Sequence, residues 1–468
     1  MTERQDIILG AGLAGLTAAY TLQERGESHW QVYEKEDRVG GHARSLTVDG
    51  FLFDFGPHIL FTRDSEMEDL IRHLLAGNFR AQHRQAFIYH ARHKTYTRFP
   101  FQAHLHGLPV SLVTRCLADL VTALEDRARG EHAPENYEQW MRGTFGTAIA
   151  ETLMIPYARK IWTVEPDTMD FSWIDRRVPT PDVARIVLGA LTDDVADIGA
   201  TATFWYPQHG GIEALPRALG ERVDNVQFGQ AMERLDPGRK LLSLRDGTQL
   251  HYDSLIFTLP LNTLSQYVAE LPPKVEKASA ALQYQGVYCV NLGIARPNLS
   301  EKHWLYFYED MFPFHRISFP ANFSPDNVPP GMSSIAAEVA FPPHRPLERD
   351  AVLEQTISAL TAADILSPDD RIEVVHTQAI LPAYVIYDLD HVRNVDLVRS
   401  WLAEHDIWTA GRFGDWEYSN MDESMRSGKR IADSIADGRR SRPAALGATN
   451  TPARPSTRGR PYQARRAT

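Results

Sequence analysis

The chain has 468 residues, of which 43% are hydrophobic, and its net charge is −11. This length permits a sizeable buried core divided over two or three lobes, and the acidic balance argues against nucleic acid as the main partner. With only two cysteines, Cys116 and Cys289, neither a disulfide framework nor a cysteine-built metal site is expected. No run of about 18 apolar residues predicts a membrane span. No signal peptide is recognised, so the expected location is cytoplasmic.

The N-terminal segment predicts a dinucleotide-binding turn. An apolar run at 7–9 leads into GAGLAG at 10–15 and then into a helical pattern. Gly10 permits the tight strand-to-helix turn, Gly12 lets the backbone approach a pyrophosphate, and Gly15 lets helix and strand pack closely. The helix N-terminus then faces the phosphates.

Two features after this turn indicate which dinucleotide is bound. Glu34 ends the next strand pattern, where an acid is expected to bind a ribose hydroxyl. A second glycine-rich turn, RVGGHAR at 38–44, contains Gly40 and Gly41 and can bring backbone amides against more of the same cofactor. This combination favours FAD over a nicotinamide dinucleotide. The alternative is that the second turn is a surface hairpin built on Gly-Gly.

The rest of the chain alternates between helical and strand patterns. Residues 105–160 show mainly helical apolar spacing, and strand-like runs follow at 241–244, 254–259 and 288–293. We expect an α/β protein with a Rossmann-like FAD-binding domain, an inserted helical domain and an antiparallel-sheet substrate domain. The expected boundaries are 1–100, 205–260 and 400–437 for the FAD-binding domain, 101–204 for the helical insert, 261–399 for the substrate domain, and 438–468 for a disordered Arg/Pro-rich tail.

Several motifs carry a specific resemblance that spans nearly the whole chain. They occur in the order FDFGPH at 53–58, FPFQ at 99–102, PYARKIW at 156–162, WLYF at 304–307, FPFHR at 312–316 and GRFGDWEY at 411–418. In this order the chain resembles the UDP-galactopyranose mutase family, closer to its eukaryotic than to its bacterial type. The resemblance implies an isomerase that interconverts pyranose and furanose forms of a nucleotide sugar, UDP-galactose or a related one. Reduced FAD would act through a flavin N5–sugar adduct, without net redox change.

The resemblance also assigns roles to individual residues. His58 is expected against the flavin ring, and Arg316 and Arg412 are expected at the reacting centre, with phosphate or flavin contacts. The cofactor set is Gly10, Gly12, Gly15, Glu34, Gly40, Gly41, Arg412, Asn420 and Asp422. The substrate set is Phe101, Gln102, Tyr157, Trp162, Arg177, Tyr306, Arg316, Tyr384 and Tyr418.

Arginine in an apolar or aromatic context independently suggests phosphate recognition. Arg316 lies in such a run and Arg412 follows an apolar strand pattern at 407–410. Guanidinium groups bind phosphate oxygens through two parallel hydrogen bonds, and a dry site strengthens that contact. The alternatives are a structural ion pair for each arginine and a packed core role for each tyrosine.

Departures from the family pattern leave the substrate open. Ala158 stands where the eukaryotic family has a larger polar residue, and the aromatic pair Trp205 and Tyr206 could accommodate another sugar or base. Two other functional classes remain: an FAD-dependent oxidoreductase of the amine or protoporphyrinogen oxidase type, and a noncatalytic FAD-binding or nucleotide-sugar-binding protein. NAD(P)H is one candidate reductant, and a homo-oligomer is one candidate state.

Overall fold

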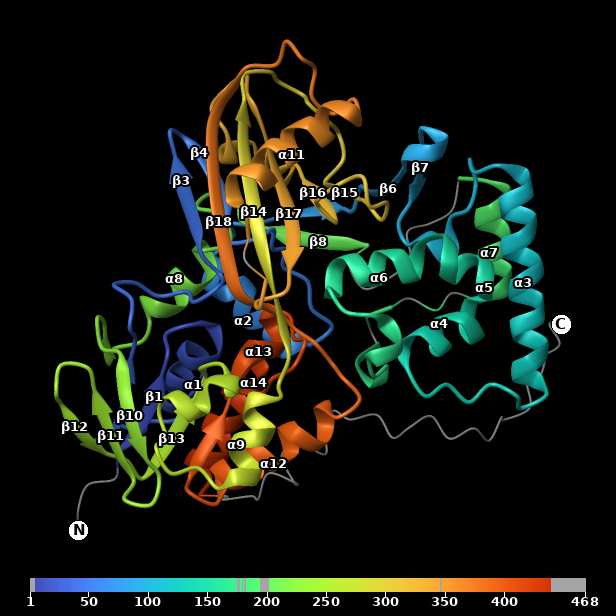
Figure 1. Cartoon of the computed structure of the whole chain (residues 1–468). Helices are drawn as coiled ribbons and strands as arrows, with labels where there is room; N and C mark the ends of the chain where they lie inside the picture. The colour runs from blue at the N-terminus through green and yellow to red at the C-terminus, as the bar shows by residue number, and fades with distance from the viewer. Residues whose placement is uncertain are drawn as a thin grey trace, which may run out of the picture.

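The computed structural model describes residues 5–174, 177, 178, 180, 182–193, 202–345 and 347–438. Figure 1 shows a small sheet with covering helices around the N-terminal strand, a long-stranded sheet beside it, and a helical unit at the far side. The α/β class expected from the sequence is confirmed. The tail expected at 438–468 lies outside the described residues, apart from residue 438.

The N-terminal strand lies at the centre of a five-stranded parallel sheet. The strand order is β19-β13-β1-β2-β9. The bounds are β1 (Asp6–Leu9), β2 (Trp30–Tyr33), β9 (Val226–Gln227), β13 (Ser254–Phe257) and β19 (Ile407–Thr409). β1 and β13 are buried along their whole length, as expected for parallel strands that are covered on both faces.

Helices cover both faces of this sheet. One face packs against α1 (Leu13–Glu24), α2 (Ser65–Leu75), α8 (Ala214–Gly220) and α14 (Met421–Ala436). The other face packs against α9 (Pro273–Ala280), α12 (His391–Ala403) and the sheet of β10 (Met232–Asp236), β11 (Leu241–Leu244) and β12 (Gln249–His251). The strands expected at 241–244 and 254–259 are thus present as β11 and β13.

A close crossing of α1 and α14 supports the nucleotide-binding turn from behind. A Cβ added at Gly428 of α14 would lie 2.0 Å from the carbonyl oxygen of Ala14, so the crossing requires glycine there. The α14 N-terminus carries a capping box, in which Asn420 and Glu423 satisfy each other's backbone N–H groups.

The second sheet has seven strands in the order β18-β14-β17-β16-β15-β6-β7. Its bounds are β6 (Ala86–His90), β7 (Thr95–Arg98), β14 (Tyr284–Ile294), β15 (Trp304–Tyr306), β16 (Arg316–Ser318), β17 (Ser333–Phe341) and β18 (Ile372–Val385), and α11 (Arg349–Ala362) covers one face. Neighbours are antiparallel except β6 and β15, which are parallel. Residues 86–98 were expected in the nucleotide-binding unit, but they form β6 and β7, which extend this second sheet.

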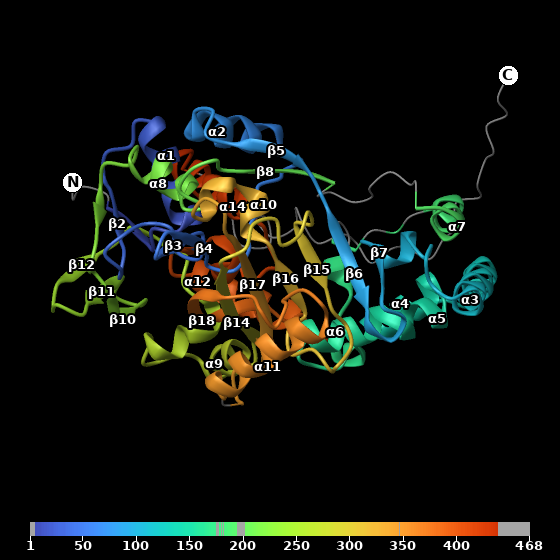
Figure 2. The same ribbon diagram turned by 90° about the horizontal axis from the view of Figure 1, so that it is seen from above.

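The helical unit comprises α3 (Val110–Ala128), α4 (Tyr137–Phe145), α5 (Thr147–Ile149), α6 (Ile155–Trp162) and α7 (Val183–Leu191), in agreement with the helical pattern at 105–160. In Figure 2, α3, α4, α5 and α7 lie beyond β6 and β7, away from the five-stranded sheet, whereas α6 lies beside the seven-stranded sheet. Two small pairings complete the fold: β3 (Ser45–Val48) with β4 (Phe51–Asp54), and β5 (Arg80–His83) with β8 (Thr203–Tyr206). Within the described ranges, no helix is long and apolar enough to cross a bilayer.

Candidate active site

One elongated cavity of about 1130 Å³ joins the three parts of the molecule. It begins at the β1–α1 turn, passes beneath the seven-stranded sheet and ends against α6 of the helical unit. Every residue of the expected catalytic, cofactor and substrate sets lines this cavity except Gly15 and Asp422, and the aromatic pair Trp205 and Tyr206 does not line it. Gly15 lies within α1, and Asp422 is buried at the start of α14.

The nucleotide end of the cavity is built by backbone groups. A Cβ added at Gly15 would lie 2.0 Å from the Gly10 carbonyl oxygen, so helix and turn can pack this closely only with glycine. The Glu34 carboxylate accepts hydrogen bonds from the Ala11 N–H at 2.6 Å and from the Glu36 N–H at 2.9 Å. These contacts fix Glu34 at the cavity wall, where each oxygen retains acceptor capacity for a ribose hydroxyl.

The same end of the cavity suits the phosphates of a dinucleotide. Gly10, Gly12 and Gly41 present backbone to the cavity, and the twelve-residue helix α1 starts there. Helix N-termini carry unsatisfied N–H groups and a positive dipole end, which bind anions. The residues present therefore fit FAD.

Two half-buried histidines, His42 and His58, line the cavity. Burial, with Arg412 nearby, lowers the pKa of His58 to about 4 and that of His42 to about 3. His58 Nδ1 lies 2.7 Å from the Gly56 carbonyl oxygen. A neutral His58 therefore carries its proton on Nδ1 and leaves Nε2 as an acceptor.

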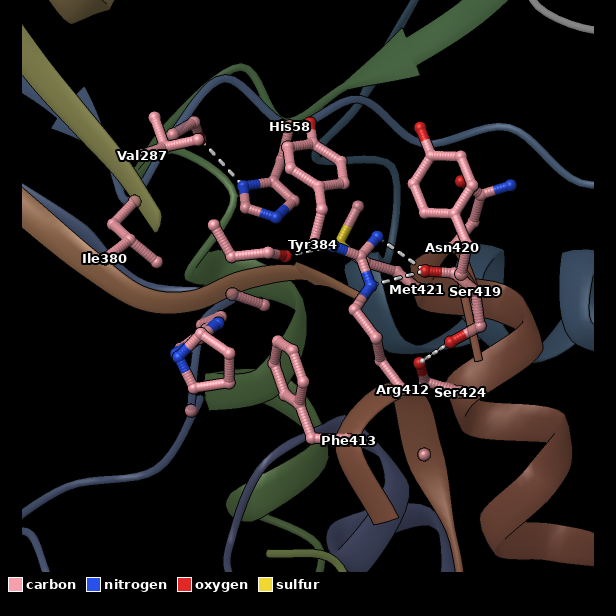
Figure 3. A pocket seen from close by; sticks show the side chains of 18 of the residues that line it. His58, Val287, Ile380, Tyr384, Arg412, Phe413, Ser419, Asn420, Met421 and Ser424 are labelled. Atoms are coloured by element: carbon pink, nitrogen blue, oxygen red, sulfur yellow. Dashed lines mark hydrogen bonds between the residues drawn. The ribbon is translucent and has the colours of Figure 1, made fainter. Parts of the chain in front are cut away.

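Arg412 connects the 419–420 turn to the end of β18 beside His58 (Figure 3). Its Nε and Nη2 donate to the Ser419 carbonyl oxygen at 2.8 and 2.5 Å, and its Nη1 donates to the Ala383 carbonyl oxygen at 3.2 Å (Figure 3). The guanidinium also lies 5.5 Å from the ring centroids of Tyr384 and Tyr418. Arg412 thus fixes the 419–420 turn and the end of β18 at the cavity wall.

Arg316 forms an ion pair with Glu338, which sequence analysis does not nominate. Nε lies 2.5 Å from Oε1 and Nη2 lies 2.8 Å from Oε2, in a forked geometry. The two residues face each other on β16 and β17. A single carboxylate in the otherwise uncharged run at 333–341 was the available signal, because a buried charge requires a partner. For Arg316, the sequence left open a phosphate contact or a structural ion pair. The structure shows the ion pair with Glu338.

Arg177 is also engaged by protein groups. Its Nη2 donates to the Tyr418 carbonyl oxygen and to Glu423 Oε2, and the guanidinium lies 4.9 Å from the Tyr418 ring centroid. Arg177 thereby connects the segment before α7 to the capping box of α14. Asp422 is 8% exposed, and its Oδ1 has no partner among the described residues.

Aromatic rings enclose the far end of the cavity. Phe99 stacks on Tyr306 at 4.5 Å between centroids, and Trp162 meets Tyr384 and Tyr418 edge-on at 6.0 and 5.7 Å. Burial holds the pKa values of Tyr157 and Tyr384 above their ordinary range, so both phenols stay neutral hydrogen-bond donors. Phe101 and Gln102 are buried at the same end.

Comparison with known proteins relates this site to flavoenzymes. Residues 13–436 match the flavin-containing amine oxidoreductase family. A crystal structure of reduced UDP-galactopyranose mutase has a TM-score of 0.89 and 28% identity, and the match covers 96% of this chain and 98% of that one. An Exiguobacterium sp. 255-15 protein assigned as a protoporphyrinogen oxidase has a TM-score of 0.72 and 19% identity, covering 94% and 100%, which shows a shared fold alone.

A sequence relative points to the oxidoreductases. The Arabidopsis thaliana protoporphyrinogen oxidase 2 is 22% identical over 296 residues, which span 54% of this chain and 57% of that protein. The aligned part is thus little more than half of the relative's length. The family match and the mutase structure agree with the glycine-lined end of the cavity in identifying FAD as the cofactor. The chain belongs to the flavin-containing amine oxidoreductase family.

Proposed function

We propose that this flavoenzyme is an isomerase that interconverts the pyranose and furanose forms of a nucleotide sugar, UDP-galactose or a close relative. The observation that carries the proposal is a group of arginines, among them Arg177, Arg316 and Arg412, that line an FAD-binding cavity together with an aromatic wall. Each of these three guanidinium groups has a protein partner, but an apolar or amine substrate would add no negative charge to balance them. A diphosphate does need fixed cations.

The distribution of side chains suggests how such a substrate would lie. The aromatic end with Phe101, Gln102 and Trp162 would hold the nucleoside, and the phenols of Tyr306 and Tyr384 would donate to diphosphate oxygens. Arg316 would supply positive charge to the leaving diphosphate. The sugar would then lie between the diphosphate and His58, at the flavin.

The bound flavin would supply, in its reduced form, a nucleophile for the anomeric carbon. His58 is neutral and presents Nε2 to the cavity, so it can accept a hydrogen bond there without bringing a charge. Arg412 would position the 419–420 turn through its three hydrogen bonds to carbonyl oxygens. The aromatic walls would exclude water while the sugar ring is open.

The second candidate is an FAD-dependent oxidoreductase of the protoporphyrinogen oxidase type. It is favoured by the sequence relative from Arabidopsis and by the family as a whole. This candidate predicts a reaction that oxidises the substrate and passes electrons to an acceptor, whereas an isomerase leaves the substrate's oxidation state unchanged.

A paired assay distinguishes the two candidates. FAD-loaded protein, reduced with dithionite under argon, is incubated with UDP-galactofuranose, and the nucleotide sugars are separated by chromatography. The proposal predicts conversion to UDP-galactopyranose by the reduced enzyme and none by the oxidised enzyme. Absence of conversion of any nucleotide sugar in a panel, together with peroxide formation from protoporphyrinogen in air, would favour the oxidoreductase.

A further inference from the structure

His315 is buried directly beside the Arg316–Glu338 pair, and the proposed function assigns it no role. It is 1% exposed, and neither ring nitrogen has a hydrogen-bond partner within the part of the chain that the structure describes. Its Nε2 lies 4.0 Å from Glu338 Oε2, too far for a hydrogen bond. Leaving such a group unpaired in the interior costs stability.

Glu338 depends on Arg316 alone for side-chain hydrogen bonds among the described residues. Its neighbours include Cys289, which faces it on β14, and the rings of Tyr157 and Tyr384. None of these three makes a hydrogen bond to the carboxylate in the described ranges. If Arg316 turned to a diphosphate, the buried Oε2 would lose the partner that it now has at 2.8 Å.

We propose that His315 is a positioning residue that receives Glu338 when a diphosphate draws Arg316 away. This inference rests on the proposed function. A movement of about 1 Å would bring Oε2 within hydrogen-bond distance of Nε2. Glu338 would thus pass from Arg316 Nη2 to His315 Nε2, and the guanidinium edge that becomes free would bind the phosphate.

The electrostatics of the pocket suit this exchange. Burial, together with Arg316 and Lys160, keeps the pKa of His315 well below its ordinary value. A neutral imidazole can still donate one hydrogen bond, and it does so without adding a charge to the buried pair. Without this donor, releasing Arg316 would leave a buried carboxylate oxygen without a hydrogen bond. The free energy of that loss would weaken the binding of the diphosphate.

The test is the affinity of the oxidised, FAD-loaded enzyme for UDP, measured by titration calorimetry. His315→Phe removes the donor, and His315→Gln keeps an N–H donor close to the position of Nε2. The inference predicts about tenfold weaker UDP binding for His315→Phe and recovery to within about threefold for His315→Gln, from the strength of a hydrogen bond to a charged group. Uridine, which has no phosphate, should bind both variants as it binds the unmodified protein.

Further controls separate positioning from structure. In a Glu338→Gln background the His315→Phe change should no longer affect UDP binding, because the carboxylate that His315 receives is absent. Unchanged UDP affinity in His315→Phe would overturn the inference, and so would an equal loss for uridine without recovery in His315→Gln. If the unmodified holoenzyme bound no UDP, the proposed function would fail together with the inference. A normal UDP affinity with no His315 effect would refute the inference alone.

Discussion

Glu338 is almost fully buried, with 3% of its side chain exposed, whereas 21% of the Arg316 side chain is exposed. The Glu338 carboxylate therefore depends on Arg316 for its hydrogen bonds, whereas the Arg316 guanidinium can also be solvated by water. Removing one member of a buried ion pair strands the other charge, which costs more than replacing both members together.

Arg316→Ala is expected to lower the free energy of unfolding by about 3 kcal/mol and to abolish isomerisation. Chemical denaturation of the FAD-loaded protein measures the first effect, and the chromatographic assay measures the second. The double variant Arg316→Met with Glu338→Met should regain most of the stability but none of the activity. A double variant as unstable as Arg316→Ala would show that the stranded carboxylate is not the cause.

Arg412 is expected to tolerate no conservative replacement. Lysine cannot donate to the Ser419 and Ala383 carbonyl oxygens in the fork geometry that Arg412 uses. Loss of two such hydrogen bonds, about 3 kcal/mol in all, would lower kcat/KM roughly hundredfold in Arg412→Lys. Steady-state kinetics at equal FAD content provides the measurement, with Arg72→Lys on the exposed face of α2 as the control. Equal kinetics in both variants would contradict the account of Arg412.

The residue-level site was only partly predictable. Arg316 and Arg412 could be nominated because a charge in an apolar run needs a partner or a ligand. The protein groups that pair with these arginines could not be predicted from the sequence. Glu338 is opposite Arg316 only through the pairing of β16 and β17, and Glu423 meets Arg177 across 246 positions of sequence. Local patterns carry no information on such pairings.

At the level of elements, the contact of α1 with α14 fixes the nucleotide-binding turn. Since a Cβ at position 428 would lie 2.0 Å from the Ala14 carbonyl oxygen, Gly428→Ala must push the two helices apart. We expect a loss of about 2 kcal/mol in the free energy of unfolding and weaker FAD retention. Thermal unfolding and the FAD released on gel filtration check both effects.

The matched control is Ser434→Ala in the same helix. Among the described residues, the Ser434 hydroxyl bonds only to the Arg430 carbonyl oxygen one turn away, so a change within about 0.5 kcal/mol is expected. If Gly428→Ala and Ser434→Ala retain FAD and unfold with equal free energies, the close crossing of α1 and α14 is not required for FAD binding or for stability.

Elements with local signals were predictable. The glycine spacing at 10–15 indicated β1 and α1, and the helical spacing at 105–160 indicated α3 to α6. The placement of residues 86–98 was not predictable. β6 joins the second sheet by pairing in parallel with β15, from a part of the chain more than 200 residues away, and such long-range pairing leaves no periodic mark in either strand.

At the scale of the whole molecule, buried histidines should make the protein sensitive to acid. Burial lowers the pKa of His42 to about 3 and those of His58, His90, His303 and His391 to about 4. Unfolded histidine titrates near 6.5. Between pH 6.5 and 4 the unfolded chain therefore binds protons that the native protein does not, and the free energy of unfolding falls as the pH falls.

Four carboxyl groups among the described residues act in the opposite sense. Burial raises the pKa of Asp54 to about 6, that of Glu417 to about 7, and those of Asp388 and Asp422 above their ordinary values, so their protonation on acidification favours the native state. The imidazoles still outnumber these carboxyls, because burial also lowers the pKa of His315. We therefore expect the Tm of the holoenzyme to fall steadily from pH 6.5 to pH 4.

A pair of variants checks the cause of this acid sensitivity. His58→Asn should make the fall in Tm less steep, whereas His251→Asn, at an exposed position in β12, should leave the slope unchanged. A Tm that stays constant or rises on acidification in the unmodified holoenzyme would show that the buried histidines do not dominate.

The central claim is that this member of an oxidoreductase family performs an isomerisation with no net electron transfer. The direct test is stoichiometric: the FAD-loaded enzyme is photoreduced by one electron pair per flavin, excess reductant is excluded, and an excess of UDP-galactofuranose is added under argon. An isomerase is expected to form many molecules of UDP-galactopyranose per flavin, with the flavin spectrum still reduced at the end. At most one product molecule per flavin, with the flavin reoxidised, would contradict it.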